Sequence, residues 1–354
     1  MGSIGEEHQF SMISKTVHKV STKPPTRGFF IGILRYKRNW FMTKNTHMTH
    51  PEDSILTGDL SVLDAFLMWC FVTLKIDGAP AIVWGRNPES GNFFVGTKSV
   101  FNKRLIKINE SHEDIDKNHS GNVATILHQC FKYLPHTNKI IQGDFIGFGD
   151  SFVDEFTPNT ITYKFDDYVT ENIIVAPHTS YSSVTTLRDA IASPMCEQLE
   201  GNSFCCFVQP RAYIRAGFGS PIGESIDSFV NTKPLVSLAY ALSTTVQFLS
   251  DKEAKVFKKE INTHIREQLE IVPETFMGGK YKKLCELYLL VMRIKLDALN
   301  ECRHECDFAA YINNNCVQGE GYTMHSKLGD WKLIDRRQFA YANFHSGIGT
   351  VVNT

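Results

Sequence analysis

Short runs of apolar residues, bounded by turn-forming residues, dominate the first two thirds of the chain. The run from Cys70 to Ile76 is followed by apolar runs at 81–84 and 93–97, and the stretch from Asn87 to Gly91 between these two is rich in turn formers. This pattern predicts three consecutive strands, with a short helix over 59–68 before them. Further strands are predicted at 139–145, 160–165, 172–176, 204–213, 321–325 and 330–334, and a further helix over 121–133.

The apolar residues recur at intervals of three and four between about residue 234 and residue 312. One series runs from Leu238 to Leu249 and another from Leu284 to Ala298, with Pro273 between them. Such spacing places apolar side chains on one face of a helix, so this block predicts several helices. The expected fold is therefore α+β, with a flexible arm over 1–27, a sheet-rich core over 28–233, a helical insertion or subdomain over 234–312, and the last core strands over 313–354.

Composition places the chain among ordinary globular proteins. Hydrophobic residues make up 42% and charged residues 21%, and the formal net charge is -1. A nucleic-acid partner would therefore be bound through a local basic surface, because the chain as a whole does not attract phosphates. No apolar run approaches the roughly 20 residues of a membrane span, and the nine cysteines lack paired spacing. We expect a soluble, cytoplasmic protein with reduced thiols and no membrane association.

The sharpest candidate for chemistry is the string Lys75-Ile76-Asp77-Gly78, at the end of a predicted strand. A half-buried lysine loses part of the solvation that stabilises its ammonium form, and the neutral amine can attack phosphorus. Asp77 would orient this amine or bind a ribose, and Gly78 would let the backbone turn sharply. Because a lone string of this kind also occurs by chance, the assignment depends on which residues follow it at suitable spacing.

Four further segments follow in an order that supports the assignment. The whole set is Lys75–Gly78, Gly96–Ser99, Gln142–Gly147, Glu320–Thr323 and Trp331–Ile334. It resembles, in order, motif I, a strand bearing a basic residue, and motifs III, IV and V of the covalent nucleotidyltransferase superfamily, which includes DNA ligases, RNA ligases and mRNA capping enzymes. The resemblance implies a nucleotidyltransferase core of twisted, largely antiparallel sheets with a nucleotide held between them.

Within that superfamily the chain is similar to RNA-ligase-like proteins encoded by tailed phages and large DNA viruses. Besides motif I, the runs Thr49–Asp53, Val95–Lys103 and Trp331–Arg336 carry this likeness. It covers residues 47–182 and 316–344, and it leaves the predicted helical block unexplained.

The resemblance implies a role for each matching residue. Lys75 would be the nucleophile, and Lys98 would contact the phosphates or the sugar. Lys332 would bind the α-phosphate and stabilise charge as pyrophosphate leaves. Asp144 would contact the ribose or a metal-bound water. Glu320 would help to hold a divalent ion, Mg²⁺ or Mn²⁺, so these two acids are the candidate metal residues.

The function that follows from the resemblance is ATP-dependent ligation of RNA, or of another polynucleotide, through a lysyl-AMP intermediate at Lys75. The partners would be ATP and nucleic-acid ends with a 5′-phosphate and a 3′-hydroxyl, RNA favoured, in the host cytoplasm if the protein is viral. The alternatives are a capping-type guanylyltransferase and a catalytically inactive viral protein that binds nucleotide or nucleic-acid ends.

Three departures from the family pattern bear on these alternatives. Asp144 stands where the family usually has glutamate, and Ile334 takes the place of the second motif V lysine. Lys327 and Arg336 are candidates to replace that lysine. The segment after Ile334 is short for the C-terminal oligonucleotide-binding domain of DNA ligases and capping enzymes, so the helical block is a candidate to recognise substrate in its place.

Polar clusters outside the motifs have a structural and a functional interpretation. Cys302, His304 and Cys306 suggest a zinc site, but buried thiols on one face of a helix fit their spacing better. His325 follows the motif IV strand closely enough to face the pocket, whereas His178 fits a surface or core histidine better.

Three further groups fit structural roles. Glu52 and Asp53, close to His47 and His50, fit the first turn of a helix better than a metal site. The pair Cys205-Cys206 fits a buried strand, and the lysines between 252 and 259 fit a solvated helix face.

Overall fold

The computed structural model describes residues 43–44, 48–183, 185–215 and 228–345. The predicted N-terminal arm over 1–27 and His47 lie outside the described residues. The described residues all belong to the compact unit Phe41–Thr354.

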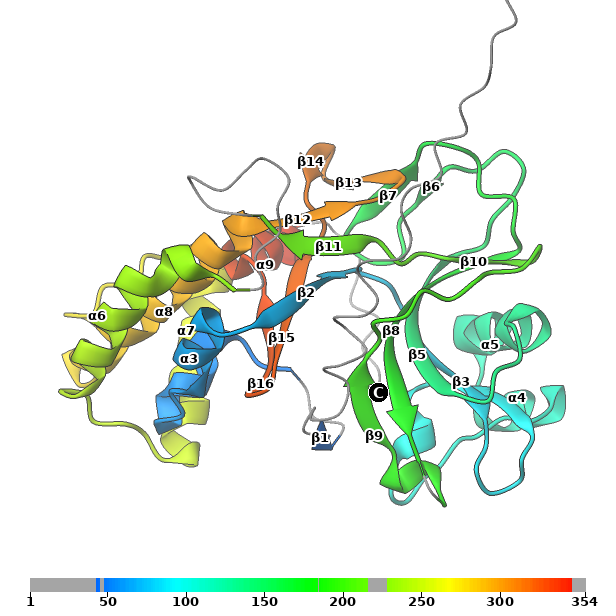
Figure 1. Cartoon of the computed structure of the whole chain (residues 1–354), viewed down its shortest axis with the longest axis horizontal. Helices are drawn as coiled ribbons and strands as arrows, with labels where there is room; N and C mark the ends of the chain where they lie inside the picture. The colour runs from blue at the N-terminus through cyan, green and yellow to red at the C-terminus, as the bar shows by residue number, and fades with distance from the viewer. Residues whose placement is uncertain (1–42, 45–47, 184, 216–227, 346–354) are drawn as a thin grey trace, which may run out of the picture. The chain divides into compact units, whose positions relative to one another are not determined.

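In the described residues, the largest sheet has seven strands and contains most of the strands predicted before residue 208 (Figure 1). Its spatial order is β1 (Thr43–Lys44), β9 (Ile191–Pro194), β8 (Ile173–Ser182), β5 (Ile140–Gly147), β3 (Ala81–Arg86) and β4 (Phe93–Gly96), with β10 (Cys205–Phe207) also paired to β8. Neighbouring strands are antiparallel except β10 and β8, which are parallel. Register in this sheet places Asp144 of β5 beside Ala81 of β3 and Ala176 of β8.

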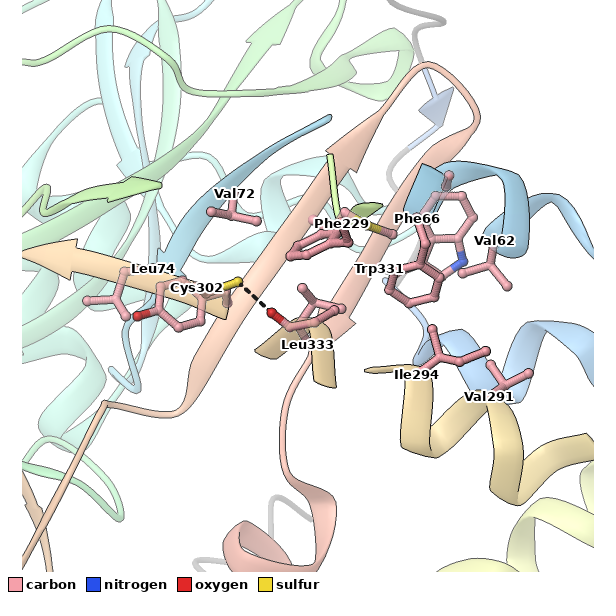
Figure 2. Packing of buried hydrophobic residues seen from close by; sticks show 14 of the residues in the cluster. Val62, Phe66, Val72, Leu74, Phe229, Val291, Ile294, Cys302, Trp331 and Leu333 are labelled. Carbon is pink, nitrogen blue, oxygen red and sulfur yellow. Dashed lines mark hydrogen bonds between the residues drawn. The ribbon is translucent and has the colours of Figure 1, made fainter. Parts of the chain in front are cut away.

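A second, three-stranded sheet brings together segments far apart in sequence. Its order is β16 (Gly329–Leu333), β15 (Gly321–Ser326) and β2 (Cys70–Lys75), all antiparallel. Apolar side chains of β2 and β16, among them Val72, Leu74 and Leu333, are buried in the main hydrophobic core (Figure 2). Because side chains alternate along a strand, the residues between them, including Lys75 and Lys332, lie on the opposite face of the sheet.

Two smaller sheets complete the strands. One has the order β14 (Asn315–Val317), β13 (Phe308–Ile312), β7 (Thr162–Phe165) and β6 (Glu155–Phe156), and the other pairs β11 (Arg211–Ile214) with β12 (Cys302–Glu305). Both sheets pair strands that lie on either side of the helical block in sequence. They therefore join the two ends of that block to the sheet-rich part of the chain.

Helices cover the apolar faces of the sheets. Helices α4 (His112–Asn118) and α5 (Gly121–Tyr133) contribute Ile115, Ile126 and Leu127 to a core with Trp84 and Val175 of the seven-stranded sheet. The remaining helices before this pair are α2 (Pro51–Ser54) and α3 (Ser61–Leu67), and the last helix described is α9 (Arg336–His345).

The helical block consists of α6 (Lys233–Ser243), α7 (Asp251–Arg266) and α8 (Lys282–Glu301). Helix α7 begins with a capping box in which Ser250 and Glu253 satisfy each other's backbone N–H groups. Helix α8 buries its face from Leu284 to Ala298 in the main core, as the apolar period predicts. In Figure 1, α6 and α8 lie side by side next to the three-stranded sheet.

The prediction of an α+β protein with antiparallel sheets is confirmed, but two of its details are wrong. Helix α8 ends at Glu301, and residues 302–312 form strands β12 and β13 instead of continuing the helix. The single strand predicted over 204–213 is two short strands, β10 and β11, which pair with different partners. In the described segments, no helix is long and apolar enough to cross a membrane.

Candidate active site

The Lys75 amine contacts the Glu320 carboxylate, although 245 residues separate the two in sequence. Register explains the contact, because Lys75 ends β2 opposite Gly321, the first residue of β15. The two side chains are mostly buried, with 24% of Lys75 and 10% of Glu320 exposed. Burial raises the pKa of Glu320 above its ordinary value, and the charge of Lys75 opposes that rise. The raised pKa makes this carboxylate a stronger base than an exposed glutamate.

Lys332 lies on the adjacent strand β16 and belongs to the same charged cluster. Its register partner is Thr323 of β15. Burial lowers the pKa of Lys332, and the positive charges of Lys75 and Lys98 lower it further. Like charges influence one another in this way only at short range. The charges of Lys75 and Lys98, from distant parts of the chain, are thus close enough to act on Lys332.

Lys98 reaches this cluster from the seven-stranded sheet. It is the first residue of a short 3₁₀ helix, Lys98–Phe101, directly after β4, and its side chain is exposed. Thr97 caps this helix by accepting a hydrogen bond from the Ser99 N–H. The cap fixes the backbone that presents Lys98.

Asp144 is brought to the Lys75 motif by Gly78. A Cβ atom at Gly78 would lie 2.8 Å from the Asp144 Cβ and 2.8 Å from the Phe145 carbonyl oxygen, closer than real Cβ atoms approach. Two hydrogen bonds hold the segments together, because Ala79 N–H donates to the Phe145 carbonyl at 3.0 Å and Phe145 N–H donates to the Pro80 carbonyl at 3.0 Å. Gly78 is thus needed for close packing of the motif against β5, in addition to the turn predicted for it.

The Asp77 carboxylate is occupied by the chain itself. It accepts hydrogen bonds from the Asn159 side chain at 2.9 Å and from the N–H groups of Thr160 at 2.9 Å and Ile161 at 3.2 Å. Its own N–H donates to the Tyr163 hydroxyl at 2.6 Å. Asp77 therefore anchors the loop before β7 beneath Lys75. The structure shows no contact of this carboxylate with the amine, which Glu320 contacts instead.

Tyr163 connects the acidic residues of the site. Burial raises its pKa well above the ordinary value, and the negative charges of Asp77, Glu320 and Asp144 add to the rise. The Tyr163 hydroxyl is thus close to three carboxylates, of which Asp144 lies in β5, Asp77 follows β2 and Glu320 directly precedes β15. No sequence motif marked Tyr163 as a site residue, because a tyrosine in an alternating strand is ordinary.

His178 and Gln142 border Asp144 on the seven-stranded sheet. The His178 Nε2 lies 3.7 Å from the Asp144 carboxylate and 3.4 Å from the Gln142 side-chain amide nitrogen. Gln142 is buried and accepts a hydrogen bond from the Tyr181 hydroxyl at 2.7 Å. His178 was predicted to be a surface or core histidine, yet it lies beside a candidate site residue and remains one-third exposed.

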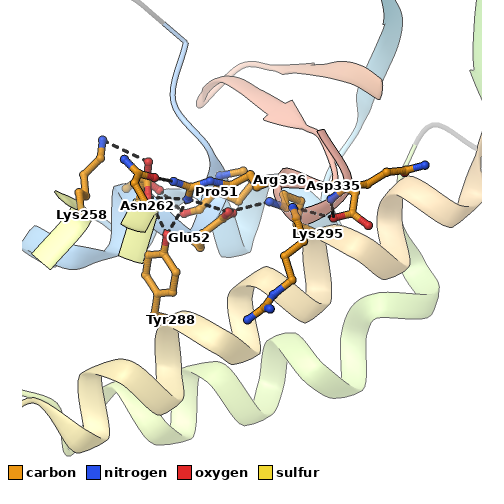
Figure 3. A network of polar contacts seen from close by, with 12 residues as sticks. Pro51, Glu52, Lys258, Asn262, Tyr288, Lys295, Asp335 and Arg336 are labelled. Atoms are coloured by element: carbon orange, nitrogen blue, oxygen red, sulfur yellow. Dashed lines mark hydrogen bonds and ion pairs between the residues drawn. The ribbon is translucent and has the colours of Figure 1, made fainter. Parts of the chain in front are cut away.

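A buried network of ion pairs holds the strand of Lys332 in place (Figure 3). Lys332 N–H donates to the Thr49 carbonyl at 3.0 Å, directly before α2. Glu52 of α2 pairs with Lys295 of α8 at 2.6 Å and with Arg336 at 3.2 Å. These contacts join α8 of the helical block to α2, which directly follows the partner of Lys332, and to Arg336, which follows Lys332 in the chain.

Asp53 extends the same network. It accepts hydrogen bonds from Arg336 at 3.1 Å and from the Tyr288 hydroxyl at 2.8 Å, and it pairs with Lys258 of α7 at 3.1 Å. Glu52 and Asp53 do lie in the first turn of a helix, as predicted. Their main contacts, however, are with cations of the helical block and with Arg336.

Neither candidate to replace the second motif V lysine lies free beside Lys332. Arg336 is 10% exposed and is bound by Glu52 and Asp53. Lys327 lies in the turn between β15 and β16. It follows the last residue of β15, whereas Glu320 precedes the first. Ile334 itself is buried in the protein interior, which explains an apolar residue at that position.

Asp144 and Glu320 are the two carboxylates to which the sequence resemblance assigns a divalent cation. In the described residues, no group of three or more His, Cys, Asp or Glu side chains is arranged to hold a metal ion. Mg²⁺ commonly takes one or two protein carboxylates and completes its shell with waters and substrate phosphates. These two side chains are therefore the residues that would hold it together with a nucleotide.

Each cysteine cluster has one buried and one partly buried thiol, and the Cys302 cluster is not on a helix. Cys302 and His304 lie on strand β12, and Cys302 is fully buried. Cys205 is also fully buried, and burial raises its pKa to about 12, which makes it unreactive. All nine cysteines are free thiols.

One protein family matches the chain over residues 45–281 and 278–347. The chain belongs to DUF6267, a family of unknown function. The DUF6267 match includes the candidate site from Lys75 to Lys332 and also the helical block, so this block is a part of the family and not an addition to it. No curated protein and no solved structure matched the chain.

Proposed function

We propose that this protein is a nucleotidyltransferase of the RNA-ligase type, in which Lys75 becomes adenylated by ATP. The observation that carries the proposal is the contact of Lys75 with Glu320 next to Lys332. It supports the resemblance in sequence, which assigns these three residues to motifs I, IV and V.

The residues can divide the first step as follows. The Glu320 carboxylate orients the Lys75 ammonium group, which loses a proton to solvent, and the free amine attacks the α-phosphorus of ATP. The new P–N bond forms as the bond to pyrophosphate breaks, and the second amine proton leaves to solvent. Lys332 and Lys98 stabilise the negative charge that develops on the phosphates. Mg²⁺, when bound by Asp144 and Glu320 with the nucleotide, supplies further charge neutralisation.

The lysyl-AMP would then pass its nucleotide to a 5′-phosphate end, and a 3′-hydroxyl would displace AMP to seal the strand. RNA is the proposed substrate on the basis of the likeness to RNA-ligase-like proteins. The helical block is joined to this part of the chain, because Lys295 of α8 pairs with Glu52 and Glu52 pairs with Arg336, four residues after Lys332.

The test is covalent labelling. The protein is incubated with Mg²⁺ and ATP radiolabelled at the α-phosphate, denatured, and examined for retained label. Label is expected with the native chain and with Lys252→Ala, an exposed lysine of α7, and none is expected with Lys75→Ala. Label from GTP in place of ATP would indicate capping chemistry. Absence of label from both nucleotides in folded protein would overturn the proposal in favour of a binding protein.

A further inference from the structure

The face of the three-stranded sheet that carries Lys75 also carries a row of polar residues. Thr73 lies two residues before Lys75 on β2, and its register partner on β15 is Thr323. Next along β15, His325 lies opposite Asp330 of β16. Residues two apart on a strand share a face and are roughly 7 Å apart. Thr73, the first residue of this row, is therefore the neighbour of Lys75 on the same face of β2.

Three of these side chains form a continuous hydrogen-bonded chain. The His325 Nδ1 lies 2.9 Å from an Asp330 carboxylate oxygen, and the His325 Nε2 lies 3.0 Å from the Thr73 hydroxyl. The histidine side chain is 6% exposed and that of Asp330 is 26% exposed. The ring also stacks on Phe71, with 4.8 Å between ring centroids. Asp330 and Thr73 thus fix the His325 ring at its two nitrogen atoms, and Phe71 packs on one of its faces.

The two contacts determine the form of the imidazole. An ionised Asp330 only accepts hydrogen bonds, so His325 donates through Nδ1–H and its Nε2 carries a lone pair. That lone pair accepts the hydrogen bond of the Thr73 hydroxyl. A hydroxyl, a histidine base and a carboxylate that orients the base form the arrangement that makes a hydroxyl able to pass on a proton.

We propose that Thr73, His325 and Asp330 form a proton relay that serves the strand-sealing step. This inference rests on the proposed ligase function. The attacking 3′-hydroxyl gives its proton to the Thr73 oxygen while Thr73 gives its own proton to His325 Nε2, and Asp330 stabilises the resulting imidazolium. The new O–P bond forms to the adenylated 5′-phosphate as the bond to AMP breaks, and AMP leaves with the electron pair. Lys75 takes no covalent part in this step.

The experiment isolates sealing from lysine adenylation. An RNA strand with a chemically adenylated 5′ end is mixed with a 3′-hydroxyl strand and excess protein without ATP, and single-turnover sealing is followed between pH 5.5 and 9. Thr73→Val removes the hydroxyl but keeps the shape, and His325→Gln removes the base. Thr73→Ser restores the hydroxyl. Thr323→Val, on the same face and opposite Thr73, is the matched control.

In the native protein, we expect sealing across this pH range. Thr73→Val and His325→Gln should seal roughly 100-fold more slowly, at the low end of general-base effects. Their rates should also depend more steeply on pH, because hydroxide then has to take the proton of the 3′-hydroxyl. Thr73→Ser and Thr323→Val should keep both the rate and the pH profile. Thermal unfolding of each variant shows whether it is folded, and a purely structural role would change the unfolding temperature but not the pH profile.

Other outcomes contradict the relay. Sealing by Thr73→Val and His325→Gln with the native pH profile, or no sealing by the native protein, would overturn it. Failure of the proposed function is distinguished by the separate ATP-labelling test, because label on Lys75 does not require Thr73. Loss of labelling in a folded Thr73→Val would also contradict the relay, since it would give Thr73 a part in the first step.

Discussion

Lys295 and Glu52 form an ion pair at 2.6 Å in which neither side chain is exposed to solvent. The pair joins α8 to α2, and Arg336 is the second cation on Glu52. Burying charges costs desolvation energy, and such a pair is tolerated only where each charge keeps its partner. Loss of this ion pair would therefore weaken the packing of the helical block against α2 and Arg336.

Replacing Lys295 by Met should lower the free energy of unfolding by about 3 kcal/mol, because Glu52 loses a partner in the interior. Urea denaturation measures the change. Lys282→Met on the same helix breaks an exposed pair with Glu274 and should cost far less. Adding Glu52→Leu to Lys295→Met should restore part of the loss. Equal costs for the two single variants would contradict the buried pair.

The positive charge of Lys332 should lower the free energy of unfolding, although Lys332 is needed for ATP labelling of Lys75. Its pKa is lowered mainly by burial and also by Lys75, so the unfolded chain holds the proton more tightly than the folded protein. Stability linked to Lys332 therefore rises with pH toward its ordinary pKa near 10.5. Lys332→Gln should unfold at higher urea concentration than the native protein at pH 7 and should lose ATP labelling.

The advantage of Lys332→Gln should shrink between pH 7 and pH 10, since the charged form that it removes becomes less populated. Lys327→Gln, in the exposed turn after β15, is the control and should change neither stability nor labelling. A Lys332→Gln protein that is less stable than the native chain at pH 7 would show that burial of the charge is not the dominant effect.

His50 should make the protein sensitive to acid. Burial lowers its pKa from 6.5 to about 2, and the positive charges of Lys295, Arg336 and Lys332 contribute, while Asp53 opposes them. The group is neutral in the folded protein and takes up a proton on unfolding, so stability present above pH 6.5 is lost as the pH falls toward 2.

Urea denaturation of His50→Gln should therefore show a shallower loss of stability between pH 7 and pH 4 than the native protein. His136→Gln, at an exposed histidine, should retain the native slope. The same slope in all three proteins would mean that His50 is not the group that takes up the proton.

Sequence patterns predicted the strands that carry Lys75 and Lys332, because a short apolar run bounded by turn-forming residues is a local signal. The family resemblance assigned Lys75 and Glu320 to one site, but their direct contact was not predicted, since no local pattern pairs residues 245 positions apart. The anchoring of Asp77 by the loop before β7 was not predicted for the same reason.

The helix predicted to reach residue 312 shows how tertiary pairing overrides local preference. Residues 302–312 include alanine, glutamate and arginine, which favour helices in isolation. Instead, β12 pairs with β11 and β13 pairs with β7, and both partners lie before the helical block. The buried cations of that block escaped prediction too, because Lys295 interrupts an otherwise apolar helix face without a visible partner nearby.

The pairing of β2 with β15 has a consequence for synthesis. Strand β2 leaves the ribosome early, whereas its partner β15 and the next strand β16 are made only after the whole helical block. Until then the nascent chain has an exposed strand edge. Chains halted before β15 is complete would therefore lack the partner of β2 and be prone to aggregate.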